Sequence, residues 1–220
     1  MKFDAILFDF DGVLIESEAQ GAQEIASTLT ALGYPTRYED AILQFNGLAD
    51  KAFLAAAEQW IGDSIPTAFH AMRAQRAQLA LTEEIGEVAG AVAFVRSLPP
   101  ELPVAIVSSS GVPWLQRHLD ALGLRDRFGD HLYSGRTHVA RGKPAPDLYL
   151  YGAERLGVAI QRCVILEDSV VGATGAVASG ATVIGLCAGT HCLSDHAERL
   201  RATGVHHIAS SFEEVARLVG

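Results

Sequence analysis

The sequence has little cysteine, a modest share of charge and no long apolar run. Three cysteines in 220 residues are too few and too odd in number for a disulfide framework, and we expect a reduced, cytoplasmic protein. Lys and Arg number 17 against 26 Asp and Glu, so the net charge is -9. That balance argues against a nucleic-acid-binding protein, which needs a basic surface to neutralise phosphates. Hydrophobic residues make up 49%, which is enough to form a buried core.

Membrane and export signals are also lacking. The N-terminal residues show no apolar stretch followed by a small-residue cleavage site, so we expect no signal peptide. Val170 to Ser194 contains no Asp, Glu, Lys or Arg, but glycines divide it and most of the rest is Ala, Ser and Thr. This stretch predicts a helix, a turn and a buried strand rather than a membrane span.

What is present is an alternation of short apolar runs with helical patterns. Such runs are typical of strands buried on both faces, and strands alternating with helices predict a doubly wound, mostly parallel α/β sheet. Leucines at helical spacing before Gly123 and before Gly157 predict helices that end at those glycines. The predicted strands are Ala5–Phe8, Val104–Val107, Cys163–Leu166 and Thr182–Leu186, with weaker candidates at His131–Tyr133 and His207–Ala209.

The region from Ser17 to Leu81 differs because it has no convincing buried strand. It is rich in Ala, Gln and Glu, with periodic stretches at Gly21–Leu32, Asp50–Ile61 and Thr67–Leu79. We therefore predict a helical insert after the first strand. The catalytic core is expected at 1–16 plus 82–220 and the insert at 17–81, with hinges at Leu14–Ser17 and Leu81–Gly86.

Carboxylates follow two of the predicted strands. Asp9 and Asp11 follow the first, a serine run from Ser108 follows the second, and Glu167 and Asp168 follow a later one. Because the carboxyl ends of parallel strands meet at one edge, these side chains are expected to converge there. Several close carboxylates stay ionised together only beside a cation, and hard oxygen ligands favour Mg²⁺. Lys143, in a loop with two prolines, suits a phosphoryl oxygen.

In this order, these residues resemble the haloacid dehalogenase superfamily, in its phosphatase and phosphomutase branch. The first motif matches Asp9-Phe10-Asp11-Gly12-Val13, the second Ser108, the third Lys143 and the fourth Glu167-Asp168-Ser169-Val170-Val171-Gly172. Any one of these motifs alone is unspecific, whereas all four in order are highly specific. The resemblance covers nearly the whole chain and implies a Rossmann-like core, with the insert as a small helical cap domain.

The resemblance also implies roles for the site residues. Asp9 attacks phosphorus to form an aspartyl-phosphate, and Asp11 acts as general acid and then general base. Ser108 and Lys143 hold the phosphoryl oxygens. Mg²⁺ is held by Asp9, the backbone carbonyl of Asp11 and Asp168. Glu167 either binds the metal directly or pairs with Lys143, and the sequence leaves this open.

The implied reaction is hydrolysis of a phosphomonoester, with a phosphomutase of the β-phosphoglucomutase type as the alternative. An acid at position 11 argues against halide or phosphonate substrates, because only an oxygen leaving group needs its proton. Mutase-type relatives carry a His ten residues after the second Asp, where this chain has Gly21. They also carry an Arg in a cap loop, which Asn46 to Lys51 lacks. A third possibility is a phospholigand-binding protein that kept the fold, against which the intact motifs argue.

The substrate is expected to be a small phosphorylated metabolite. The stretches His131–Gly135 and Cys163–Gly172 are similar to sugar-phosphate phosphatases of the 6-phosphogluconate phosphatase type, which implies a sugar, sugar-acid or polyol phosphate. Candidate substrate contacts are Ser109, Asn46, Gly47, Lys51 and Arg76, with Arg73 on the same helix face as Arg76. A solvated helix face explains the two arginines equally well, and Ser109 and Ser110 commonly only line a loop. The oligomeric state is left as monomer or homodimer.

One cluster falls outside these motifs. Cys187, His191, Cys192 and His196 contain the residue types of a zinc site, but their spacing matches no common zinc pattern. We therefore expect structural or surface roles, with His196 on the first turn of a helix that Ser194 or Asp195 caps. Trp60 and Trp114 are expected to pack in a core or an interface.

Overall fold

The computed structural model describes residues 2–48, 50–80 and 84–220. The chain forms two compact units, Met1–Glu16 with Gly86–Gly220, and Ser17–Ile85. The segments where the chain leaves and re-enters the first unit are hydrogen-bonded to each other, since the Glu16 amide donates to the Gly86 carbonyl over 2.9 Å. The second predicted hinge, Leu81–Gly86, includes residues 81–83, which lie outside the described residues.

The first unit is built on a six-stranded sheet in which every paired strand is parallel. Its strand order is β3-β2-β1-β4-β5-β6, so the predicted doubly wound, Rossmann-like α/β fold is confirmed. The strands are β1 (Ala5–Phe8), β2 (Val104–Ser108), β3 (Leu132–Ser134), β4 (Cys163–Glu167), β5 (Thr182–Leu186) and β6 (His207–Ala209).

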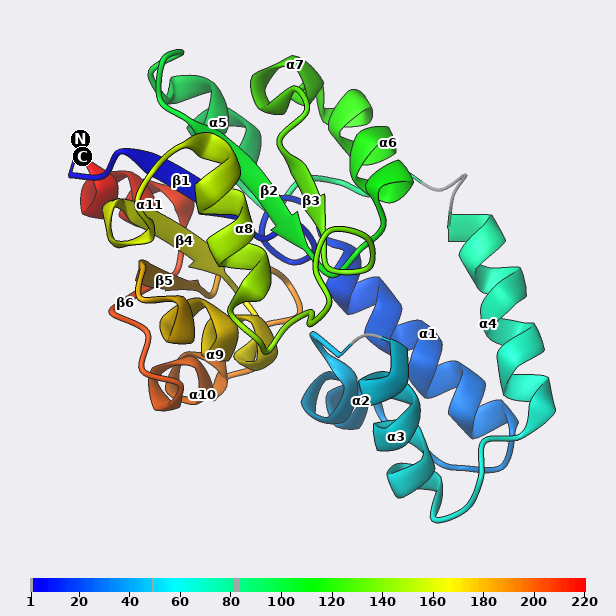
Figure 1. Ribbon diagram of the computed structural model, residues 1–220. Coiled ribbons are helices and arrows are strands. Elements are labelled where there is room, and N and C mark those ends of the chain that lie inside the picture. The colour runs from blue at the N-terminus through cyan, green and yellow to red at the C-terminus, as the bar shows by residue number, and fades with distance from the viewer. Residues whose placement is uncertain (1, 49, 81–83) are drawn as a thin grey trace. The chain divides into compact units, whose positions relative to one another are not determined.

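Helices cover both faces of this sheet (Figure 1). They are α5 (Ala91–Ser97), α6 (Val112–Leu122), α7 (Arg125–Phe128), α8 (Asp147–Leu156), the short 3-10 helix η1 (Ile160–Arg162), α9 (Val170–Ser179), α10 (His196–Ala202) and α11 (Phe212–Val219). Gly123 and Gly157 end α6 and α8 in the left-handed conformation, with φ of 63° and 70°, which confirms both predicted stops.

Alternation along β1 explains why the sheet is buried on both sides. Leu7 belongs to a core cluster with Tyr149 of α8, while the ring of Phe8 packs edge-on against Phe94 of α5 and Phe128 of α7. Successive side chains of a strand point to opposite faces. An all-apolar strand such as β1 is therefore stable only between two helical layers.

The second unit is helical, with α1 (Ser17–Ala31), α2 (Tyr38–Phe45), α3 (Asp50–Ile61) and α4 (Thr67–Ala80). Its core includes Phe45, Phe53 and Phe69, whose neighbouring ring centroids lie 5.6 and 6.2 Å apart. Trp60 packs its ring against Phe45 and donates its indole N–H to Thr36 Oγ1 over 2.9 Å.

The uncharged stretch Val170–Ser194 forms α9, β5 and the loop that follows, as its glycines predicted. Among the described residues, none of the helices has the length and apolar character needed to cross a membrane.

Candidate active site

The carboxyl ends of three neighbouring strands bring the predicted carboxylates and Ser108 to one edge of the sheet. Asp9 follows β1, Ser108 ends β2, and Glu167 ends β4 and precedes Asp168. The register pairs Phe8 with Ile106 on one side and with Leu166 on the other, so Asp9 stands level with Glu167 and Ser108 lies one residue further along its strand. Asp9 is 7% exposed and Ser108 1%, and Glu167 and Asp168 are fully buried.

Lys143 joins this group from the loop before α8. Its Nζ lies 2.7 Å from Asp9 Oδ1 and also contacts Glu167 Oε1. Burial opposes the charged ammonium, but the two carboxylates outweigh that effect and raise the pKa of Lys143. The pKa of Asp9 is raised well above its usual value by burial and by the nearby Glu167 charge, which Lys143 only partly offsets.

Glu167 is held by a second donor that sequence reasoning missed. The Tyr149 hydroxyl donates to Glu167 Oε1 over 2.6 Å and lies 2.9 Å from the Gly172 carbonyl. Burial, followed by the Glu167 charge, raises the pKa of Tyr149 well above its usual value. Gly172 leaves the space that this carboxylate fills, since a Cβ at that position would overlap all three carboxyl atoms of Glu167.

Asp11 is held by two donors from the segment after β2. The Ser110 hydroxyl donates to Asp11 Oδ2 over 2.6 Å, and the Trp114 indole N–H donates to Oδ1 over 3.0 Å. Trp114 was expected to pack in a core or an interface, and its hydrogen bond to Asp11 was not predicted. The available signal was its position in the first turn of the helix that follows Ser108.

The residues at this edge fit a divalent cation. Carboxylate oxygens of Asp9, Glu167 and Asp168 lie within 4.8 Å of one another. The Oδ1 atom of the buried Asp168 carboxylate accepts no hydrogen bond from a described residue. A buried carboxylate oxygen without a donor is costly, and converging hard oxygens are the ligand set that Mg²⁺ prefers.

Two histidines contact Asp168 from the loop after β5 and the start of α10. His191 Nε2 lies 2.9 Å from Asp168 Oδ2, and His196 Nε2 lies 2.7 Å from the Asp168 carbonyl oxygen. Burial disfavours a charged His191, but the contact with Asp168 outweighs it and raises the pKa of His191 to about 11. His196 is the first residue of α10, as predicted, and Asp195 occupies the N-cap position without a capping hydrogen bond from its side chain.

The remaining candidates were predicted substrate contacts. Ser109 is half-buried beside Ser108. In the second unit, Asn46 follows α2 with a buried Oδ1 that lacks a described partner, Gly47 has a positive φ of 74°, and Lys51 is exposed on α3.

The two arginines of α4 have partners inside the second unit. Arg76 forms an ion pair with Glu24, and the Arg73 guanidinium lies 4.0 Å from the centroid of the Phe53 ring. Their role in substrate binding stays a prediction, as do those of Ser109, Asn46, Gly47 and Lys51.

Comparisons with known proteins agree with this geometry. The haloacid dehalogenase-like hydrolase family matches residues 3–180. The chain is 27% identical to the 6-phosphogluconate phosphatase of Escherichia coli (strain K12), over 86% of this chain and 85% of that protein. It is 31% identical to hexitol phosphatase A of the same organism, over 84% of this chain and 83% of that protein.

A solved structure extends the likeness to nearly the whole chain. A HAD family hydrolase from Deinococcus radiodurans R1, with bound phosphate and sodium, superimposes with a TM-score of 0.82 at 35% identity. The match covers 99% of this chain and 95% of that one.

Proposed function

The chain belongs to the haloacid dehalogenase-like hydrolases, and from this membership we propose that it hydrolyses a small sugar, sugar-acid or polyol phosphate through an aspartyl-phosphate. Its relatives named as phosphatases agree with phosphatase activity in general. One observation gives the main support for the proposed substrate class and mechanism. Ser108 lies at one buried sheet edge together with four charged residues, Asp9, Asp11, Lys143 and Asp168.

In the first step, a carboxylate oxygen of Asp9 attacks phosphorus and the bond from phosphorus to the leaving oxygen breaks. Asp11 gives its proton to that oxygen. In the second step, water attacks the phosphorus of the aspartyl-phosphate and passes a proton to Asp11. The bond between phosphorus and the Asp9 oxygen then breaks, which releases phosphate and restores Asp9.

Lys143 and Ser108 position the phosphoryl group during both steps. The Lys143 ammonium is buried between Asp9 and Glu167, so its positive charge lies next to the attacking oxygen. Fixed charges placed where negative charge develops are worth more in a water-excluded site than in solution. We infer that Glu167, which accepts from both Lys143 and Tyr149 through Oε1, serves to hold Lys143 in place.

Asp9 and Asp168, with the backbone carbonyl of Asp11, are the residues we propose as ligands of Mg²⁺. When bound, the ion neutralises phosphoryl charge and lets the carboxylates stay ionised together. The Asp168 carboxylate suits this role because its Oδ1 is buried without a hydrogen bond from a described residue.

The relatives, and the small size of the helical unit that we propose as a cap domain, support the proposed substrate class. One relative is named for 6-phosphogluconate and another for hexitol phosphates, which are both linear polyhydroxylated phosphates. We propose that Asn46, Gly47, Lys51 and Arg76 contribute to reading the leaving group.

The test is release of inorganic phosphate from a panel of sugar, sugar-acid and hexitol phosphates, with nucleotides as the contrasting class, in the presence of Mg²⁺. The native chain is expected to turn over at least one polyhydroxylated phosphate well above nucleotides, and Asp9→Asn to turn over none. Asp9→Asn keeps the shape of the side chain and removes the nucleophilic oxygen, so it is the matched control.

Two results would overturn the proposal. Equal turnover by the native chain and Asp9→Asn would remove Asp9 as nucleophile. No release from any compound, together with bisphosphate-dependent interconversion of sugar phosphate isomers, would establish a phosphomutase instead.

A further inference from the structure

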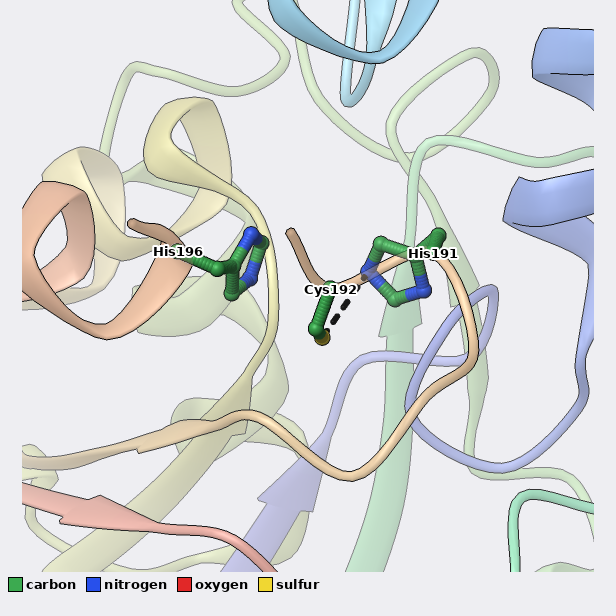
Figure 2. Close-up of side chains that lie close together, drawn as sticks. All are labelled: His191, Cys192 and His196. Atoms are coloured by element: carbon green, nitrogen blue, oxygen red, sulfur yellow. Dashed lines mark hydrogen bonds between the residues drawn. The ribbon is translucent and has the colours of Figure 1, made fainter. Parts of the chain in front are cut away.

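A second group of metal-ligating side chains lies beside the carboxylate site. His191, Cys192 and His196 each offer one ligand atom, and these atoms lie within 4.8 Å of one another. Figure 2 shows Cys192 between the two imidazole rings, with its sulfur linked to a nitrogen of His191. Unlike Asp9, Glu167 and Asp168, this group offers nitrogen and sulfur, which suit Zn²⁺ rather than Mg²⁺.

The tautomer of His196 is fixed by its backbone contact. Its Nε2 lies 2.7 Å from the carbonyl oxygen of Asp168, and a carbonyl only accepts, so Nε2 carries the hydrogen. In a neutral ring, Nδ1 then has a free lone pair, and this atom is buried without a described partner. Metal-binding histidines are commonly oriented in this way, with one ring nitrogen donating to a carbonyl and the other left for the ion.

His191 is oriented by packing on its other side. A Cβ on Gly189 would lie 2.6 Å from both Nδ1 and Cε1 of His191, so the ring lies directly on this glycine. That contact directs Nε2 toward Cys192 Sγ, 3.7 Å away. Zinc bonds of about 2.3 Å to sulfur and about 2.0 Å to nitrogen, set at a tetrahedral angle, separate the two ligand atoms by about 3.5 Å.

We propose that His191 Nε2, Cys192 Sγ and His196 Nδ1 bind one Zn²⁺ ion, which displaces the proton that His191 Nε2 shares with Asp168 Oδ2. Asp168 is not part of this three-residue group, since its carboxylate oxygen lies with those of Asp9 and Glu167. Zinc held by three protein ligands keeps the fourth tetrahedral position open. The site goes beyond the proposed phosphatase function, and its ion ties the loop after β5 to the start of α10.

The local geometry also explains why spacing did not predict this site. Cys187, which shares the segment, is not part of the ligand group. The ligands come instead from the loop after β5 and from the first residue of α10. Because β5 pairs with β4 in parallel, the loop after β5 reaches the edge where Asp168 lies.

Cobalt is the probe for the test because it replaces zinc and is coloured. Co²⁺ is titrated into the reduced chain in excess Mg²⁺, with no substrate present, and absorption is recorded. The native chain is expected to show a thiolate-to-cobalt charge-transfer band in the near ultraviolet, with visible bands of tetrahedral Co²⁺. Cys192→Ser is expected to lose the charge-transfer band, and Cys187→Ser, the matched control, to keep it.

Zinc affinity gives an independent measurement, by competition with a chromophoric chelator. Loss of a second-shell partner alone weakens metal sites about 10- to 100-fold, so we expect Cys192→Ser to bind Zn²⁺ at least about 100-fold more weakly than Cys187→Ser. The absence of a charge-transfer band in the native chain would overturn the proposal whether or not any variant folds. A band that survives in Cys192→Ser would overturn it as well.

Discussion

Individual side chains at the sheet edge take their properties from neighbours distant in the sequence. Asp11 receives hydrogen bonds from Ser110 and Trp114, and Lys143 lies between Asp9 and Glu167. The motifs predicted which residues meet, because strand ends converge in a parallel sheet. They did not predict the donors that hold them.

The separate roles of Asp9 and Asp11 lead to a first prediction. Asp11→Asn removes the proton donor and acceptor but leaves the nucleophile. With p-nitrophenyl phosphate, the leaving oxygen needs no proton, so the first step stays fast while attack by water slows by about 10²- to 10⁴-fold. Stopped-flow absorbance is expected to show a burst of p-nitrophenolate close to one equivalent per chain, followed by slow turnover. Slow release without a burst would contradict this division of roles.

The hydrogen bond from Trp114 to Asp11 leads to a second prediction. Trp114→Phe keeps an aromatic ring but removes the indole N–H, which leaves Asp11 Oδ1 without that donor. Because small displacements of a catalytic group cost up to about 10²-fold in rate, we expect kcat to fall about 10-fold with KM little changed. Trp60→Phe is the matched control, since Trp60 donates to Thr36 in the helical unit. An equal loss of kcat in both variants would indicate a general structural effect.

These contacts explain which features of the candidate site the sequence did not predict. Asp9 and Lys143 were predictable because their roles follow from motif order. Trp114 and Tyr149 were not, because each reaches its carboxylate through the packing of a whole helix, α6 or α8, on the sheet. An aromatic residue with one polar atom has the same helical spacing whether it packs or donates.

At the scale of elements, strands were easier to predict than helix boundaries. β1 and β4 are apolar throughout their length or nearly so, since they are buried on both faces. The helix α2 escaped prediction because it spans only Tyr38–Phe45 and ends before Gly47, which is too short for a clear period. Local packing decides which substitutions a helix accepts, and two glycines within helices illustrate this.

Gly21 and Gly172 lead to a third prediction, because identical substitutions should have opposite effects. A Cβ at Gly21 in α1 meets nothing within 4 Å, so Gly21→Ala is expected to stabilise the chain by about 0.5–1 kcal/mol through helix propensity. In α9, a Cβ at Gly172 overlaps the Glu167 carboxylate. We expect Gly172→Ala to lower Tm and phosphatase activity together. Thermal unfolding of both variants checks the pair, and a rise in Tm for Gly172→Ala would contradict the packing argument.

The ion pair that joins the start of β1 to η1 gives a fourth prediction. Hydrogen bonds from Arg162 lower the pKa of Asp4. The pair therefore adds stability above the unfolded pKa of about 3.9, and this contribution is lost as pH falls through the lower folded pKa. Asp4→Asn is expected to lower Tm slightly at pH 7, and the difference from the native chain should shrink to nothing below that pKa. A difference that persists or grows with acidity would contradict this sign.

At the scale of the whole molecule, negative charge occurs in two forms: a net excess over the chain and a buried cluster of carboxylates. The net charge of -9 belongs to the whole chain, and any dissolved salt screens the repulsion that it causes. The carboxylates of Asp9, Glu167 and Asp168 are a local concentration of the same sign, buried within 4.8 Å of one another. The two can be separated experimentally, because screening depends on ionic strength whereas coordination depends on the identity of the cation.

Thermal unfolding in Mg²⁺ and in NaCl of equal ionic strength gives the fifth prediction. A ligand at about 100 times its Kd stabilises the native state by about 2.7 kcal/mol, so Mg²⁺ is expected to raise Tm by several degrees more than NaCl does. Asp168→Asn removes one carboxylate charge from the group at nearly constant shape, and in this variant Mg²⁺ and NaCl should act alike. Equal shifts in the native chain would mean that Mg²⁺ only screens the net charge. An excess that survives in Asp168→Asn would place the cation away from β4, because the charge that this substitution removes would then contribute nothing to binding.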